Sequence, residues 1–222
     1  SWPRGDVAAA AQLLGRCSDV TVFGSDATLA WVQSRLGSGV AFHGFGHRVS
    51  GHWMPGIPST ALLAAVAADI AAWGQRGCMG SHVVFTDLGE REATAAAEAL
   101  AAAIAAEAER TGAAVSRETQ EAGFLWRTER SFTHEVVTAR HAAVAIGPAP
   151  ATLLGPGGLH VTLVPGSELP TALDVKLSTV ITTETTLPDW LASAPRVARP
   201  GTAQQPPIDR LHDGQRRLGR EP

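Results

Sequence analysis

The chain has 222 residues, enough for one large domain or two small ones. Its 45% hydrophobic and 18% charged content is globular, and its net charge of −3 lacks the basic surplus of a nucleic-acid binder. With only two cysteines, Cys17 and Cys78, a disulfide scaffold is excluded and a cytoplasmic location is expected. No apolar run approaches the roughly 20 residues of a membrane span, so we expect none.

Strand and helix patterns alternate along the first half of the chain. We predict a helix over 8–14, a buried parallel strand over 19–24, a helix over 27–36, a strand over 40–42, a loop over 44–56, a helix from Ser59 to about Trp73, and a glycine-rich loop over 74–81. The first strand–helix–strand unit implies a parallel sheet with a right-handed crossover.

The second half continues the alternation. We predict a strand over 83–86, a long alanine-rich helix over 90–112, an ambiguous segment over 118–130, and two weak strands within 136–146. A strand over 159–164, a short helix over 169–177 and a strand over 179–183 follow, and then irregular backbone over 201–207 and a frayed tail over 216–222. The fold class is therefore α/β. Because little sheet precedes the strand at 19–24, we expect that strands completing it are missing from the chain.

Cys78 lies in the run GCMGS (77–81), between a predicted helix and a predicted strand. Flanking glycines allow close approach of a ligand, and a thiolate there could attack a thioester or an aldehyde carbonyl, with nearby amides as an oxyanion hole. The alternative is a buried structural cysteine. Cys17 has no such setting and is expected to pack in the interior.

Three histidines, His43, His47 and His52, cluster in the glycine-rich segment. With Cys78 they could bind zinc, although their spacing matches no zinc finger. A general base is the more plausible role, since histidine titrates near neutrality, and plain solvation is the alternative. We assign no metal ligand.

A second candidate site is the turn Gly24-Ser25-Asp26, where a strand ends and a helix begins. Free amides at a helix start suit a phosphate. Asp26 would oppose an anion, so Ser25 is the better contact. Arg48 could contact a cofactor or CoA phosphate, or be solvated.

The order of these motifs resembles the acyl-CoA reductases of the bacterial bioluminescence type, a branch of the aldehyde dehydrogenase superfamily. The resemblance spans nearly the whole chain and is carried by the runs VFGSDAT (22–28), GFGHRVS (44–50), ADI (68–70), QRGC (75–78), PPID (206–209) and HDG (212–214). It implies an aldehyde-dehydrogenase-like α/β fold: a partial Rossmann-like cofactor domain (1–52), a catalytic cysteine domain with a parallel sheet (53–185), and an irregular or oligomerisation segment (186–222).

The resemblance also implies an activity, the reduction of a long-chain fatty acyl-CoA thioester to an aldehyde with NADPH or NADH. Cys78 matches the catalytic cysteine, while Gly24, Ser25 and Gly46 fall in the cofactor-binding region. The implied partners are a fatty acyl-CoA or acyl-protein thioester and either a homo-oligomer or acyl-transfer proteins.

The sequence departs from the family pattern in three ways. Family members are about twice as long, so the chain is expected to match their C-terminal part. Met79-Gly80-Ser81 replaces the expected Leu/Phe-Ser-Pro, and the position of the superfamily's glutamate base is occupied by His43-Gly44-Phe45. That absence fits reduction better than oxidation, with His43 as a candidate base. The alternatives are a non-catalytic fragment or half of a split enzyme, and a metal-binding module on the histidine-rich loop.

Overall fold

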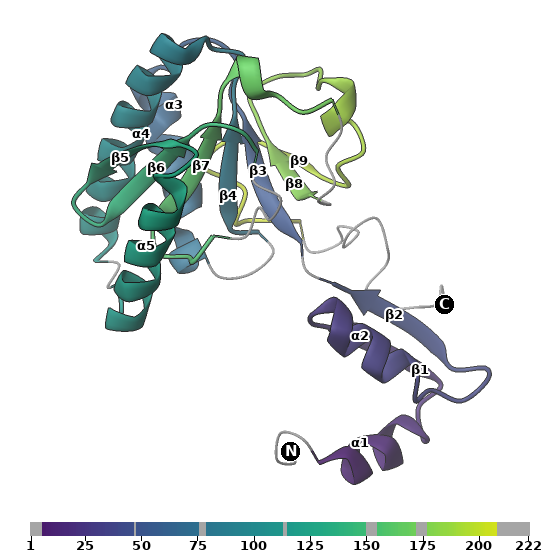
Figure 1. Cartoon of the computed structure of the whole chain (residues 1–222). Coiled ribbons are helices and arrows are strands. Elements are labelled where there is room, and N and C mark those ends of the chain that lie inside the picture. Colours follow the sequence, from purple (N-terminus) through teal and green to yellow (C-terminus); the bar gives the residue numbers. More distant parts are fainter. Residues whose placement is uncertain are drawn as a thin grey trace. The chain divides into compact units, whose positions relative to one another are not determined.

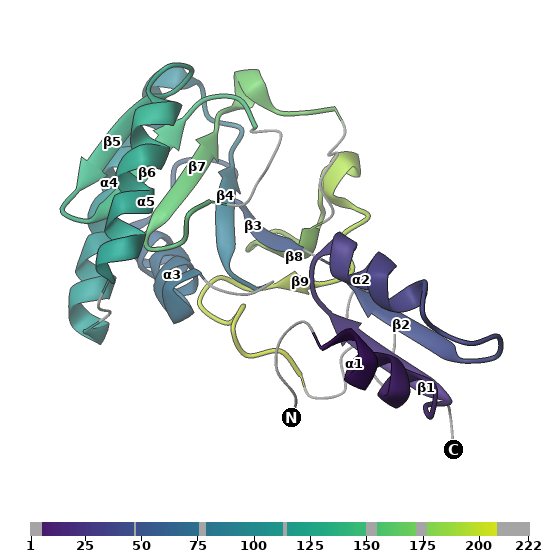
Figure 2. The same cartoon turned by 60° about the horizontal axis from the view of Figure 1, so that its bottom comes forward.

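The computed structural model describes residues 6–46, 48–75, 79–112, 115–149, 155–171 and 177–207. These residues divide into two compact units, 6–46 and 48–207, each described here by itself. Figures 1 and 2 show the elements of both units. Among the described residues, no helix is both long enough and apolar enough to cross a membrane.

The smaller unit is a strand–helix–strand arrangement preceded by a helix. Its elements are α1 (Val7–Leu14), β1 (Asp19–Phe23), α2 (Asp26–Gln33) and β2 (Ala41–Phe45). β1 and β2 are parallel, as predicted, and pair from Asp19 with Ala41 to Phe23 with Phe45. The predicted burial of β1 is wrong: of its five residues only Val20 is buried, because the described part of this unit packs few side chains against the strand.

The larger unit contains, within the described ranges, a seven-stranded sheet of order β5-β6-β7-β4-β3-β8-β9. All neighbours are parallel except the β5–β6 hairpin. The strands are β3 (Val49–Trp53), β4 (Ser81–Phe85), β5 (Glu135–Ala139), β6 (Ala142–Ile146), β7 (His160–Val164), β8 (Leu177–Ile181) and β9 (Val197–Ala198). The helices are α3 (Thr60–Ala71), α4 (Glu90–Thr111) and α5 (Arg117–Arg130), with 3-10 turns η1 (Ala72–Gln75), η2 (Gly166–Glu168) and η3 (Asp189–Leu191).

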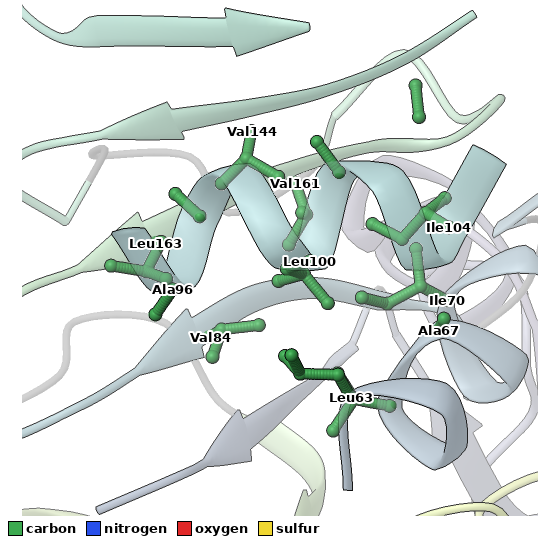
Figure 3. Close-up of a cluster of buried hydrophobic side chains, with 14 of the residues drawn as sticks. Leu63, Ala67, Ile70, Val84, Ala96, Leu100, Ile104, Val144, Val161 and Leu163 are labelled. Atoms are coloured by element: carbon green, nitrogen blue, oxygen red, sulfur yellow. The ribbon is translucent and has the colours of Figure 1, made fainter. Parts of the chain in front are cut away.

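The helices cover both faces of this sheet (Figure 1). α3 and α4 bury an apolar stripe on one face, where Leu63, Ile70, Leu100 and Ile104 meet Val84 and Leu163 (Figure 3). On the opposite face Trp126 of α5 packs on Ala143 and Ala145 of β6. Strands covered on both sides lose the alternation of buried and exposed residues, which explains why every residue of β4 and β6 is buried.

Local capping sets the helix boundaries near the predicted residues. Ser59 caps α3 by accepting a hydrogen bond from the Leu62 amide, and α4 ends at Gly112, which is left-handed with φ 64°. The ambiguous segment is α5, whose start is capped by Ser116.

Two predictions for this unit fail. Residues 49–53, assigned to a loop, form the buried strand β3, which lies between β4 and β8. The predicted helix over 169–177 is not confirmed, because Leu169 is extended and Leu177 begins β8, whereas 172–176 lie outside the described residues. Residues 201–207 have no helix or strand, as predicted, and the predicted frayed tail over 216–222 lies outside the described residues.

The α3–α4 core can be tested at Leu100, whose side chain is fully buried. Leu100→Ala removes buried methyl groups and leaves a cavity, so we expect the free energy of unfolding to fall by about 2–5 kcal/mol in urea titration. Leu125→Ala, at a side chain 67% exposed, should change it by less than about 0.5 kcal/mol. Equal losses in both variants would contradict the assignment of the core.

Candidate active site

The candidate nucleophile Cys78, with Arg76 and Gly77, lies outside the described residues. The chain on either side of it is described, from Trp73 to Gln75 and from Met79 onward. These flanks therefore define how the segment that carries the thiol is attached to the sheet.

The chain reaches this segment through three consecutive left-handed residues. Trp73, Gly74 and Gln75 have φ of 53°, 61° and 59°. Residues other than glycine are disfavoured in this left-handed region, and each one there lowers the stability of the fold by on the order of 1–3 kcal/mol. Trp73 is 77% exposed, so the restraint on the turn must come from the residues that follow it.

The Gln75 side chain provides that restraint. It is buried, and its Nε2 donates to the carbonyl oxygens of Ser81 and His160, at 2.8 and 2.9 Å. Its Oε1 accepts from the amides of Leu159 and His160, at 2.9 and 3.0 Å. One amide group thus makes the four hydrogen bonds available to it and joins the starts of β4 and β7.

Backbone contacts bring the turn still closer to the sheet. The Gly158 amide donates to the Gly74 carbonyl oxygen at 3.1 Å. A Cβ at Gly80 would lie 2.7 Å from the Gln75 carbonyl oxygen, so only glycine fits there. Downstream of Cys78, the Met79 carbonyl oxygen accepts from Gln204 Nε2 at 2.7 Å. Hydrogen bonds therefore hold the chain at Gln75, three residues before Cys78, and at Met79, one residue after it.

A buried polar network lies beside this turn. His52 Nδ1 is 2.8 Å from Ser81 Oγ, and its Nε2 is 3.5 Å from Asp69 Oδ2, a distance too long for a strong hydrogen bond. The Asp69 carboxyl group accepts from the Gly201 and Ala203 amides at 2.7 and 3.1 Å. Because all three side chains are at most 2% exposed, this Ser–His–Asp set supports the sheet and cannot reach a substrate.

Sequence reasoning missed this network. His52 was assigned to a loop, yet it lies in the buried strand β3. The signal that could have revealed Asp69 is its isolation as an acidic residue in the apolar helix α3, since a buried carboxyl group requires partners.

Two further buried histidines lie at the beginning of β4 and of β7, and burial favours the neutral form of each ring. His82 Nδ1 accepts from the Gly155 amide at 3.2 Å, and burial lowers the His82 pKa. His160 Nδ1 lies 3.1 Å from the Gly157 carbonyl oxygen, and His160 Nε2 accepts a hydrogen bond from Arg127 Nη1 at 2.8 Å. Burial is the main cause that lowers the His160 pKa, and the charge of Arg127 lowers it further.

A cavity of about 800 Å³ opens beside the turn. Its wall includes Trp73 and Gly74, and this volume is within the range of small-molecule sites. The other described lining residues come from α3, α4, the start of α5 and the approach to β7: Ala68, Ala71, Ala72, Glu107, Thr111, Val115, Ser116, Thr119, Gly158 and Leu159.

The candidate cofactor residues lie in the smaller unit. Ser25 caps α2: its Oγ accepts from the Thr28 amide at 3.2 Å and lies 2.9 Å from Thr28 Oγ1. The Gly24 amide donates to the Phe45 carbonyl oxygen at 3.1 Å, which joins this turn to the end of β2. Gly46 follows β2 directly.

His43 lies in β2 opposite Thr21. Its Nε2 is buried and has no hydrogen-bond partner among the described residues.

His43 and His52 belong to different units, and His47 lies outside the described ranges. Within those ranges, no three His, Cys, Asp or Glu residues are grouped so that they could hold a metal ion.

The role of Gln75 predicts a large loss of stability. Gln75→Leu keeps the volume of the side chain but leaves four buried backbone groups without partners, so we expect the free energy of unfolding to fall by at least about 3 kcal/mol. Gln33→Leu, at an exposed position, is the matched control and should be nearly neutral. A small effect in Gln75→Leu, measured by urea titration, would mean that the turn is held by other contacts.

The lowered pKa of His160 predicts a pH dependence. The folded state favours neutral imidazole, so stability is highest above the ordinary pKa of 6.5 and declines as pH falls through the lowered value, because the unfolded chain binds more protons. His160→Gln keeps an acceptor for Arg127 without a titrating ring, and the decline between about pH 7 and 5 should become shallower. Urea titrations across this range test it; an unchanged slope would refute it.

A family model described as acyl-CoA reductase (LuxC) matches residues 1–144. No curated protein matches the chain.

Solved structures share its fold at low sequence identity. A protein assigned as methylmalonate-semialdehyde dehydrogenase from Sinorhizobium meliloti, complexed with NAD, is 15% identical with a TM-score of 0.64, over 88% of this chain and 48% of that one. The 1-pyrroline-5-carboxylate dehydrogenase from Thermus thermophilus is 12% identical with a TM-score of 0.58, over 85% of this chain and 44% of that one. An NAD-dependent benzaldehyde dehydrogenase from Corynebacterium glutamicum is 12% identical with a TM-score of 0.57, over 89% of this chain and 50% of that one.

The chain therefore spans about half the length of the solved structures that it matches. Its α/β fold is that of the aldehyde dehydrogenases. Because the family model covers more than half of its residues, the chain belongs to the acyl-CoA reductase (LuxC) family.

Proposed function

We propose that this chain takes part in the reduction of a long-chain fatty acyl-CoA thioester to an aldehyde, with NADPH or NADH as reductant and Cys78 as nucleophile. The observation that carries the proposal is the family match, whose range of 1–144 includes Cys78. The attachment of the upstream flank of Cys78 to the sheet, and of its downstream flank to Gln204, gives the proposal physical support, because a nucleophile reacts efficiently only when its position is fixed.

The first half-reaction is acyl transfer. The Cys78 thiolate attacks the acyl carbon, the bond from that carbon to the CoA sulfur breaks, and the departing CoA thiolate takes up a proton. The product is an acyl-enzyme thioester on Cys78. In this proposal residues 53–185 form the catalytic domain, and the tethers at Gln75 and Met79 hold the thiol-bearing segment during the transfer.

The second half-reaction is reductive. A nicotinamide cofactor, when bound, would supply a hydride to the acyl carbon. The resulting hemithioacetal oxyanion would re-form its C=O bond as the carbon–sulfur bond breaks, which releases the aldehyde and restores the Cys78 thiolate. The smaller unit offers groups that fit such a cofactor: the first amides of α2 have no partner within the helix, and Ser25 can contact a phosphate or ribose hydroxyl. We assign cofactor binding to Gly24, Ser25 and Gly46.

His43 is assigned to proton transfer in this scheme. It stands at the position of the superfamily's glutamate base, and its Nε2 has no hydrogen-bond partner among the described residues. No carboxyl group needs to activate a water molecule, because the acyl-enzyme is resolved by hydride.

The two cysteines of the chain allow a matched test. Incubation with a radiolabelled long-chain acyl-CoA should label the protein, and Cys78→Ala should abolish the label. Cys17→Ala should keep it, because Cys17 Sγ donates to the Leu13 carbonyl oxygen in α1 at 3.4 Å and its side chain packs against the core of the smaller unit. NADPH should then release labelled aldehyde.

The outcomes separate the two half-reactions. A label that survives Cys78→Ala would contradict the assignment of the nucleophile. A label on Cys78 that NADPH does not discharge would limit this chain to acyl transfer and contradict the reductive step.

A further inference from the structure

Two smaller cavities continue from the cavity beside Trp73 and Gly74. The first, of about 290 Å³, shares Val115 and Leu159 with it. The second, of about 220 Å³, shares Val115, Arg140 and His141 with the first. The shared walls make the three cavities neighbours along one side of the larger unit.

The character of the lining changes along this row. Near the turn the walls are mostly small and apolar, from α3 and the approach to β7. The last cavity is lined by Arg127, Arg140, His141, His160, Gln120 and Val115, without an acidic side chain among its described lining residues. One end therefore adjoins the chain segment that leads to Cys78, and the other end is cationic.

The two arginines keep donors for a ligand. Arg127 donates to His160 Nε2 at 2.8 Å, and since the lowered pKa keeps that ring neutral, this bond leaves the charge of Arg127 uncompensated. None of the ion pairs found among the described residues includes Arg127. Arg140 contacts the Glu109 carboxylate, and its side chain is 70% exposed. A guanidinium group has five N–H donors, so each arginine can still bind an anion.

We propose that this cationic cavity binds the phosphate groups of the CoA moiety, with Arg127 and Arg140 as the anion-binding residues. The inference rests on the proposed function, because it requires the thioester end of the same ligand to reach Cys78. Arginine forms bidentate, charge-assisted hydrogen bonds with phosphate. The cavity beside the turn is mostly apolar and suits the uncharged arm of the ligand. The middle cavity, whose wall includes Glu109 as well as Arg140 and His141, lies between it and the cationic cavity.

A nicotinamide dinucleotide also carries phosphates, so the shared chemistry is that of a nucleotide pyrophosphate. CoA is favoured here because the row of cavities ends at the turn that precedes the candidate nucleophile. The dinucleotide is assigned to the smaller unit.

The test measures the binding of free CoA, pantetheine and NADPH by calorimetry to the full chain. Arg127→Gln and Arg140→Gln should each weaken CoA binding about tenfold or more, and each should leave pantetheine and NADPH binding unchanged. Arg117→Gln is the matched control on α5: it lies outside this cavity and pairs with Glu121 at 2.9 Å. The wild-type affinity for CoA should also fall with added salt.

Arg140→Gln is the decisive variant if Arg127→Gln fails to fold, because Arg140 is exposed. Unchanged CoA affinity in Arg140→Gln, no CoA binding by the wild type, or a loss confined to NADPH would each overturn the inference. Acyl labelling of Cys78 is measured separately with an acyl-pantetheine thioester. If Cys78 is labelled but CoA binding does not depend on the two arginines, the phosphate site is refuted and the proposed function stands. If CoA binding depends on the arginines but Cys78 is not labelled, the site is supported and the proposed function is refuted.

Discussion

The side-chain amide of Gln75 is the interaction on which the candidate active site depends. Three successive left-handed residues form a turn that the chain would not adopt unaided, and the four hydrogen bonds of Gln75 offset that strain. The same bonds satisfy backbone groups at the starts of β4 and β7 that would otherwise be buried without partners. The turn and the sheet edge are therefore stable only together, and Gly80 is needed because a Cβ there would collide with the Gln75 backbone.

The edge of the sheet where β3, β4 and β7 begin is unusual in being polar and buried at once. Ser81, His82 and His160 stand at the starts of their strands, and Asp69 faces His52 from α3. Such groups are tolerated only when they are hydrogen-bonded, and the segment after β9 supplies part of the bonding through the amides of Gly201 and Ala203. The C-terminal segment thus completes the polar interior and, through Gln204, also contacts the segment next to Cys78.

Local signals in the sequence predicted most of the helices and strands, and long-range contacts explain the failures. Ser59 and Gly112 are capping residues whose effect is local, so the ends of α3 and α4 could be predicted. Residues 49–53 contain Gly51 and His52, a composition typical of a loop. The glycine is needed in the strand because a Cβ at position 51 would lie only 2.8 Å from Val83 Cγ1 of the neighbouring β4. The role of Gln75 was equally hidden, since its partners Leu159 and His160 lie more than 80 residues away in the sequence.

His160 connects the two functional assignments physically. Its ring accepts from Arg127, which faces the cationic cavity, while its backbone amide and carbonyl oxygen bond the Gln75 side chain. His160 thus contacts both Arg127 of the proposed phosphate site and Gln75, which anchors the turn before Cys78. Burial keeps its ring neutral, so it can accept from Arg127 without competing for the anion. A rigid strand start that holds both groups fixes the spacing between an anion site and a nucleophile, which is what a ligand with a reactive group at one end and phosphates at the other requires.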